Sequence, residues 1–95
     1  YNLDTILLAN FASSRIQKSN KIVDLGTGNG ILMLYLSLHT NAKLTGYDIT
    51  EAHIKIANQN IDMNHLEHQI TAIHKDITTL DRLDCDTIIT NPPYY

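Results

Sequence analysis

A glycine-rich segment, VDLGTGNG at residues 23–30, is the part of the sequence best suited to hold a ligand. Gly26, Gly28 and Gly30 permit backbone angles and a close ligand approach that a side chain would block. A dinucleotide-binding loop requires G-x-G-x-x-G, but the position for its third glycine is an isoleucine here. Asp24 precedes the loop, and an acid there suits an ammonium group better than a pyrophosphate. This favours a zwitterionic ligand that carries an amino-acid tail.

Two further acids, Asp48 and Asp76, follow strand-like runs of sequence. Asp48 lies 18 residues after Gly30 in the sequence. This is close to the spacing at which an acid accepts hydrogen bonds from two ribose hydroxyls. Asp76 is followed by Ile77, so the acid can accept an adenine amino hydrogen while its neighbour packs on the ring. Each acid taken singly is more readily a helix cap or a turn former. Asp24, Asp48, Asp76 and Asn91 all lie at the ends of strand-like runs, and together they favour a binding site along the carboxyl edge of a sheet.

The segment NPPYY, residues 91–95, ends a strand-like run, because two prolines fit neither a strand nor a helix. The two prolines fix the backbone there, so the side-chain oxygen of Asn91 and the carbonyl of Pro92 are held rigidly. Stiff corners at strand ends are places where functional residues tend to lie. The alternative is a plain strand-ending turn with exposed tyrosines.

The elements that must position these residues alternate between strand and helix patterns. Strands are predicted at 21–25, 43–48, 69–76 and 85–91, and helices at 3–17, at 31–39 and from a Thr50 cap to about Met63, with a short helix or turn at 78–84. This alternation predicts an α/β fold, a Rossmann-like doubly wound parallel sheet of strand order 3-2-1-4. The fourth strand would then be an exposed apolar edge, so we expect a partial fold whose C-terminal strands are absent, or a second copy at that edge.

Composition excludes several classes of protein. The net charge of −3 gives no overall basic signal for nucleic acid. The single cysteine, Cys85, cannot form an internal disulfide and fits a reducing cytoplasm. No apolar run is long enough to span a membrane. The five histidines have no tight ligand spacing, so no metal site is predicted.

This order of motifs resembles the class I methyltransferases that use S-adenosyl-L-methionine, and NPPY at 91–94 is typical of members that methylate a planar amino or amide nitrogen. The other residues that carry the resemblance are VDLGTGNG, YDI ending at Ile49 and KDI ending at Ile77. The resemblance implies catalytic roles for Asn91, Pro92 and Tyr94. The side-chain oxygen of Asn91 and the carbonyl of Pro92 would accept both hydrogens of the target amino group, and Tyr94 would stack on the flat target, which is worth about 1–3 kcal/mol per base. An exocyclic amino nitrogen is a poor nucleophile, so positioning would supply most of the catalysis. The resemblance also implies that the following residues bind the cofactor: Asp24, Gly26, Thr27, Gly28, Gly30, Asp48, Ile49, Asp76, Ile77 and Asn91.

The first residues, YNLDTILLANF, are similar to the helix before the first strand in bacterial adenine-N6 methyltransferases that modify a valine tRNA. The order Asp4-Thr5 departs from the Thr-Asp order of that family. The resemblance implies methyl transfer to adenine N6 in tRNA, with residues 1–95 as the N-terminal, cofactor-binding part and the RNA held mainly by an absent C-terminal part. We expect this part alone to be weak or inactive. The alternatives are a methyltransferase for guanine amino groups of rRNA, for DNA adenine or for release-factor glutamine, a non-catalytic nucleotide-binding module, or half of an NAD-dependent oxidoreductase.

Overall fold

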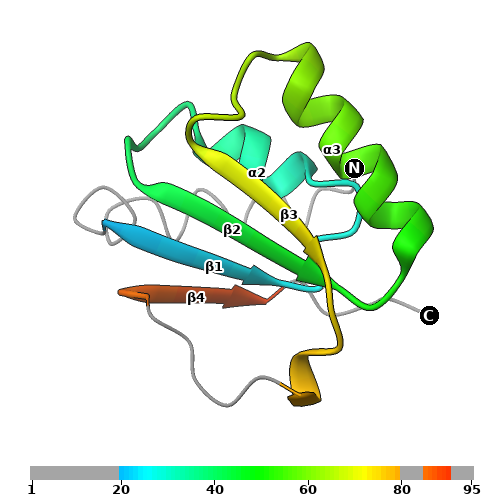
Figure 1. Ribbon diagram of the computed structural model, residues 1–95. Coiled ribbons are helices and arrows are strands. Elements are labelled where there is room, and N and C mark those ends of the chain that lie inside the picture. Colours follow the sequence, from blue (N-terminus) through cyan, green and yellow to red (C-terminus); the bar gives the residue numbers. More distant parts are fainter. Residues whose placement is uncertain (1–19, 80–84, 91–95) are drawn as a thin grey trace.

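The computed structural model describes residues 20–79 and 85–90 (Figure 1). The described strands are β1 (Lys21–Leu25), β2 (Lys43–Asp48), β3 (Ile70–His74) and β4 (Thr87–Thr90). The described helices are α2 (Ile31–Leu36), α3 (Glu51–Met63) and a single 3-10 turn, η1 (Ile77–Thr79). The predicted helix at 3–17, most of the predicted segment at 78–84 and the NPPYY segment lie outside the described residues.

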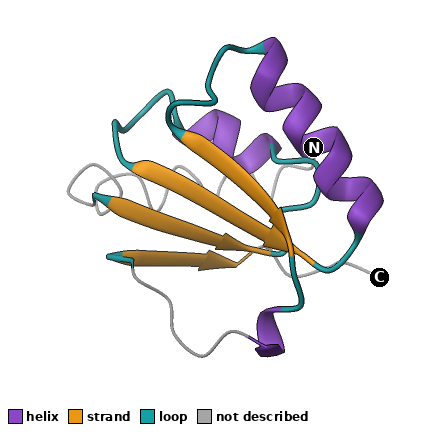
Figure 2. Cartoon of the chain, viewed as in Figure 1, coloured by secondary structure: helices purple, strands orange, loops and turns teal. Residues whose placement is uncertain are grey.

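The four strands form one parallel sheet in the order β3-β2-β1-β4, which confirms the predicted topology (Figure 2). Parallel neighbours require crossover connections, and the helical segments between β1 and β2 and between β2 and β3 supply them. Among the described strands, β1 is therefore inside the sheet, with β4 at one edge and β3 at the other. Both α2 and α3 lie on the same face of the sheet in Figure 1.

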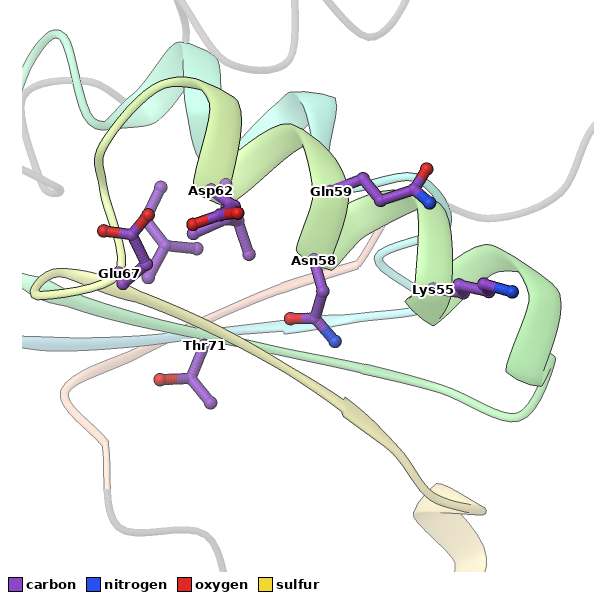
Figure 3. A pocket seen from close by; sticks show the side chains of 8 residues that line it. Lys55, Asn58, Gln59, Asp62, Glu67 and Thr71 are labelled. Carbon is purple, nitrogen blue, oxygen red and sulfur yellow. The ribbon is translucent and has the colours of Figure 1, made fainter.

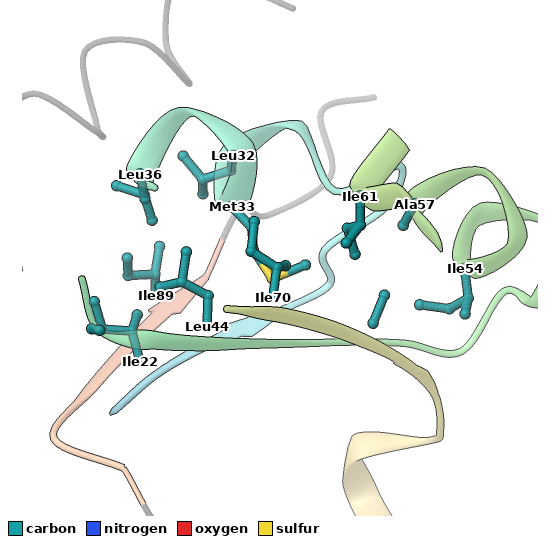
Figure 4. Close-up of a cluster of buried hydrophobic side chains, with 12 residues drawn as sticks. Ile22, Leu32, Met33, Leu36, Leu44, Ile54, Ala57, Ile61, Ile70 and Ile89 are labelled. Carbon is teal, nitrogen blue, oxygen red and sulfur yellow. The ribbon is translucent and has the colours of Figure 1, made fainter. Parts of the chain in front are cut away.

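The hydrophobic core fills the space between that face and the two helices (Figure 4). Because side chains alternate between the two faces of a strand, every second strand residue points into this core. On α3 the inward residues recur at helical spacing, as predicted. Its members are Ile22, Leu32, Met33, Leu36, Ala42, Leu44, Ile54, Ala57, Ile61, Ile70, Ala72 and Ile89. Burying an aliphatic side chain of this size stabilises the fold by about 1.5–3 kcal/mol. The core thus fixes α3 against β2 and β3, next to the carboxyl end of β1.

Two predicted boundaries are wrong for identifiable reasons. The helix predicted to reach residue 39 ends at Leu36, where the Ser37 hydroxyl donates to the Leu34 carbonyl at 2.6 Å and the chain tightens into turns. The strand predicted from residue 85 begins at Thr87. Asp86 instead accepts backbone N–H groups of Asn20 and Lys21, at 2.7 and 3.1 Å, beside the start of β1.

A smaller correction concerns the third strand and the cap of α3. The third strand is Ile70–His74 rather than 69–76. Thr50 occupies the N-cap position, but its side chain makes no capping hydrogen bond. The Asp48 carboxylate instead accepts the Thr50 N–H at 2.8 Å. The acid at the end of β2 therefore takes part in starting the next helix.

The second face of the sheet carries another apolar row. Register places Val23 beside Ile88 of β4, and Leu25 in line with Tyr47 and Ile73. Ile88 is 51% exposed and Ile73 is 36% exposed. Neither described α-helix lies over this face (Figure 1). No helix within the described ranges is long and apolar enough to cross a membrane.

Candidate functional site

The loop between β1 and α2 has the backbone conformation that its glycines predict. The φ angles of Gly26, Gly28 and Gly30 are 74°, 57° and 83°. These values lie in the left-handed region, where a residue with a Cβ is strained by roughly 1–2 kcal/mol. Gly30 is also the N-cap of α2. The loop therefore turns the chain from β1 into the helix within a few residues and keeps its backbone accessible.

Backbone hydrogen bonds attach this loop to the end of β2. The N–H groups of Gly26 and Thr27 both donate to the Tyr47 carbonyl, at 2.9 and 3.0 Å. The Gly28 N–H donates to Oδ2 of Asp48 at 2.8 Å. The predicted neighbourhood of the glycine loop and Asp48 is thus a direct contact in the structure. Register alone could not have predicted it, because it depends on the left-handed turns.

The glycines have different structural roles. A Cβ at Gly28 would meet no atom within 4 Å, so this side of the loop is open. A Cβ at Gly30 would lie 3.1 Å from the Cβ of Ala57 on α3. Gly28 is therefore the position where a ligand could approach, whereas Gly30 lets the loop pack closely on α3.

Gly46 on β2 is a supporting residue that the sequence analysis missed. A Cβ there would lie 2.6 Å from both the Met33 side chain and the Thr27 hydroxyl. The sheet can only pass beneath the loop and α2 because this position has no side chain. A glycine within a strand pattern, which indicates close backbone approach, is the signal that could have identified it.

Asp24 is deeper in the fold than predicted. It is opposite Gly46 and Ile89 in the register, whereas Asp48 is at the last position of its strand. Its side chain is only 1% exposed, and neither carboxyl oxygen has a hydrogen-bond partner among the described residues. The Thr27 hydroxyl is also buried without a partner of good geometry there. Asp24 thus lies near the carboxyl end of β1, as expected, but is buried there rather than exposed at the edge.

Burial raises the pKa of Asp24 to about 7, and repulsion from the nearby Asp48 carboxylate acts in the same direction. The neighbouring Thr27 hydroxyl lowers the pKa and offsets part of this rise. A buried carboxyl with no partner is costly unless it stays protonated or meets a donor. Asp24 is thus available to a hydrogen-bond donor or a cation that reaches the space under the loop.

Asp48 connects the loop to α3 through both of its oxygens. Oδ2 accepts the Gly28 N–H and Oδ1 accepts the Thr50 N–H, each at 2.8 Å. Nδ1 of His53 lies 3.6 Å from Oδ1, and that histidine side chain is 54% exposed. Each carboxylate oxygen has about two acceptor positions, so Asp48 can still accept hydroxyl donors from a ligand.

The end of β3 supplies Asp76 and two apolar neighbours. Oδ1 of Asp76 accepts the backbone N–H and the hydroxyl of Thr78, at 2.9 and 2.8 Å, and these bonds lower the pKa of Asp76. This acid therefore caps η1, as the turn-forming alternative predicts, and stays ionised. Ile49 after β2 is 65% exposed and Ile77 after β3 is 42% exposed. Two unburied aliphatic side chains thus follow two neighbouring strands beside two acids.

The remaining predicted site residues, Asn91, Pro92 and Tyr94, lie outside the described residues. β4 pairs in parallel with β1 and ends at Thr90. The strand that leads to these residues thus ends at the same edge of the sheet as β1, whose end carries the glycine loop. Their roles stay predictions.

A separate open groove of about 650 Å³ runs between α3 and β3 (Figure 3). Polar side chains line most of it: Lys55, Asn58, Gln59, Asp62, Glu67 and Thr71. None of the predicted site residues contributes to its walls. No group of three or more metal-ligating side chains occurs within residues 20–79 and 85–90. The glycine loop with its acids is therefore the better candidate site.

Comparison with known sequences gives matches over nearly the whole chain. Residues 4–95 match the family model described as "Methyltransferase small domain". The tRNA1(Val) (adenine(37)-N6)-methyltransferase of Tolumonas auensis is 34% identical over 94 residues, which cover 97% of this chain and 39% of the relative. The ribosomal protein L11 methyltransferase of Carboxydothermus hydrogenoformans is 32% identical over 90 residues, which cover 95% of this chain and 30% of the relative. The chain thus spans well under half the length of these curated relatives.

Solved structures share the fold. A putative RNA methyltransferase from Pyrococcus horikoshii superposes with a TM-score of 0.81 at 20% identity, covering 95% of this chain and 43% of that one. The plantazolicin methyltransferase, solved in complex with SAH, gives a TM-score of 0.74 at 27% identity, covering 92% of this chain and 35% of that one. The first likeness supports the fold alone.

Proposed function

The chain belongs to the methyltransferase small domain family, and from that premise we propose that it is the N-terminal, cofactor-binding part of an enzyme that methylates adenine N6 in tRNA. The family resemblance predicted from the motifs is confirmed. The family and the neighbour solved with SAH indicate S-adenosyl-L-methionine as the cofactor. The activity and the substrate are inferences for the whole protein, since the chain spans 39% of the first relative.

The observation that carries the proposal is the contact between Gly28 and Asp48. Three left-handed glycines hold the loop open above an acid that accepts the Gly28 N–H at 2.8 Å. An open position at Gly28 next to a carboxylate with remaining acceptor capacity fits a ribose with two hydroxyls. The side chains of this region are carboxylates, which accept hydrogen bonds and attract cations, and two exposed aliphatic groups, which can pack on a ring. This combination suits an adenosine with a cationic amino-acid tail.

We assign each side chain a binding role. Asp24, buried and without a hydrogen-bond partner among the described residues, would receive the ammonium group, and the Thr27 hydroxyl beside it would orient that end. Asp48 would accept the ribose hydroxyls. The adenine would pack between Ile49 and Ile77, with its amino group directed to Asp76. The bound cofactor supplies an electrophilic methyl group, and these residues hold it in one orientation.

The target would be held by the NPPY segment that follows β4. Acceptors at Asn91 and Pro92 would orient the two amino hydrogens of an adenine, and Tyr94 would stack on its ring. An adenine within paired or stacked RNA must first be flipped out. We place the reaction in the cytoplasm, which fits the single cysteine, and we assign RNA binding mainly to the rest of the protein.

Two measurements on the complete natural protein test this proposal. Calorimetry should show binding of S-adenosylhomocysteine that is lost in Asp48→Ala, while Asp62→Ala, which removes an acid on the far groove, should bind normally. Mass spectrometry of tRNA from cells that lack the gene should show one methyl group fewer on adenine. Normal tRNA methylation in those cells would refute the substrate assignment, and absence of cofactor binding by the wild-type protein would refute the enzymatic one.

A protein substrate is the second candidate, because one relative of comparable identity carries the name ribosomal protein L11 methyltransferase. Methyl transfer from labelled cofactor should distinguish the two. We expect label in tRNA and none in ribosomal protein L11 when both are offered to the complete enzyme. Label in the protein and none in tRNA would favour the second candidate.

A further inference from the structure

We propose that Asn60 is a positioning residue for the cofactor-binding loop, an inference that rests on the proposed function. Asn60 is on α3 and is not among the residues that the motifs assign to the ligand. Its side-chain Nδ2 donates to the backbone carbonyl of Asn29 at 3.0 Å. Asn60 is half-buried, so this bond is partly protected from competition with water.

The bond to Asn29 completes a two-sided support of the loop. On one side, the end of β2 receives the N–H groups of Gly26, Thr27 and Gly28, as described above. On the other side, α3 contributes both the Asn60 amide and the close packing of Ala57 on Gly30. The two α3 contacts act on consecutive residues, Asn29 and Gly30.

Asn60 helps to fix the direction of the Asn29–Gly30 peptide. The Asn29 carbonyl accepts from Asn60 on α3, while the Gly30 N–H of the same peptide unit donates to the Thr27 carbonyl at 3.0 Å. Glycine can adopt either sign of φ readily, so these two hydrogen bonds, rather than the conformational preference of Gly30, hold the peptide in one orientation. The donor on α3 is the one that ties the peptide to the rest of the fold. Rotation would disturb the Gly28 N–H, whose bond to Asp48 orients the ribose-binding acid.

The expected effect is a loss of preorganisation. A loop that must be ordered on binding lowers affinity without removing any ligand contact. The net value of one hydrogen bond to a neutral acceptor corresponds to roughly three- to tenfold in an equilibrium constant. We therefore expect removal of the Asn60 donor to weaken cofactor binding by about that factor.

The test uses Asn60→Asp in the complete natural protein, with Asn58→Asp as the matched control. Both exchange an amide for a carboxylate on α3, but Asn58 is exposed and lines the groove on the other side. Calorimetry with S-adenosylhomocysteine should give a three- to tenfold higher Kd for Asn60→Asp only. NMR hydrogen exchange on the ligand-free protein should show faster exchange of the Gly28 and Gly30 amides, while the core amide of Leu44 keeps its protection. Asn60→Ser, which shortens the side chain without adding a charge, should give the same pattern.

The exchange measurement separates this inference from the proposed function, because it needs no ligand. Faster exchange limited to the loop supports the positioning role even if the wild-type protein binds no cofactor. Equal loss of protection at Gly28 and Leu44 would show that Asn60 merely stabilises the fold and would overturn the inference. Unchanged loop exchange in both Asn60 variants would also overturn it.

Discussion

Replacing Asp24 by an asparagine should change how stability depends on pH. Burial raises the folded-state pKa of Asp24 from 3.8 to about 7, so the folded protein retains a proton between these values that the unfolded chain releases. The contribution of Asp24 to stability must therefore fall as pH rises from about 4 to about 7, and the loss is complete above pH 7. About three pH units at ~1.4 kcal/mol each give a loss of about 4 kcal/mol, an upper figure for a group only 1% exposed.

The amide that this substitution introduces cannot ionise, so Asp24→Asn should lack the pH-dependent loss. Urea unfolding of the ligand-free protein at pH 4.5, 6 and 8 measures it. The stability difference between variant and wild type should move in favour of the variant by several kcal/mol across that range. All other ionisable side chains are the same in both proteins, so their contribution cancels in the difference. The absolute values at pH 4.5 are less informative, because a buried amide without partners costs about 1–3 kcal/mol itself.

The same substitution should weaken the binding of the cofactor. If Asp24 receives the ammonium group, Asp24→Asn at pH 8 will be more stable than the wild type, yet will bind S-adenosylhomocysteine at least tenfold more weakly. Parallel stability profiles for the two proteins would refute the reasoning about burial. A stabilised variant with unchanged affinity would refute the binding role while leaving the burial argument intact.

Three further substitutions have expected outcomes. Gly46→Ala should destabilise the protein by about 1–3 kcal/mol in urea unfolding, because its Cβ would lie 2.6 Å from Met33 and Thr27. Asp48→Asn should raise the Kd for S-adenosylhomocysteine at least tenfold in calorimetry, because the amide replaces an acceptor and loses the negative charge. Ile49→Ala should leave the melting temperature nearly unchanged, since the side chain is 65% exposed, and should weaken cofactor binding several-fold.

Each of these has a contrary outcome, and the isoleucine substitution also has a matched control. Ile56→Ala removes another exposed isoleucine, on α3, and should leave cofactor affinity unchanged. Equal loss of affinity in both isoleucine variants would argue against adenine packing on Ile49. A Gly46→Ala protein as stable as the wild type would show that Met33 and Thr27 can move apart. Normal affinity in Asp48→Asn would remove Asp48 from the ribose-binding role.

The sequence predicted the parts of this structure that depend on local pattern. Strand order followed from alternating strands and helices with right-handed crossovers, and the inner face of α3 followed from its spacing. The burial of Asp24 did not follow, although the bounds of its strand were predicted correctly, because the burial depends on which parts of the fold cover the strand end. Gly46 and Asn60 were missed because their roles depend on contacts across the fold, with Thr27 and with Asn29, that no local pattern encodes.

The hydrogen bonds that hold the glycine loop also bear on which cellular adenosine compounds it can accept. Four of its N–H groups, those of Gly26, Thr27, Gly28 and Gly30, already donate to acceptors within the protein. Phosphate-binding loops depend on such groups being free to point at the anion. With those donors engaged and carboxylates beside them, ATP and NAD should be rejected at their phosphates although they share the same adenosine. A ligand of opposite charge at that end would enter without competition from these nucleotides.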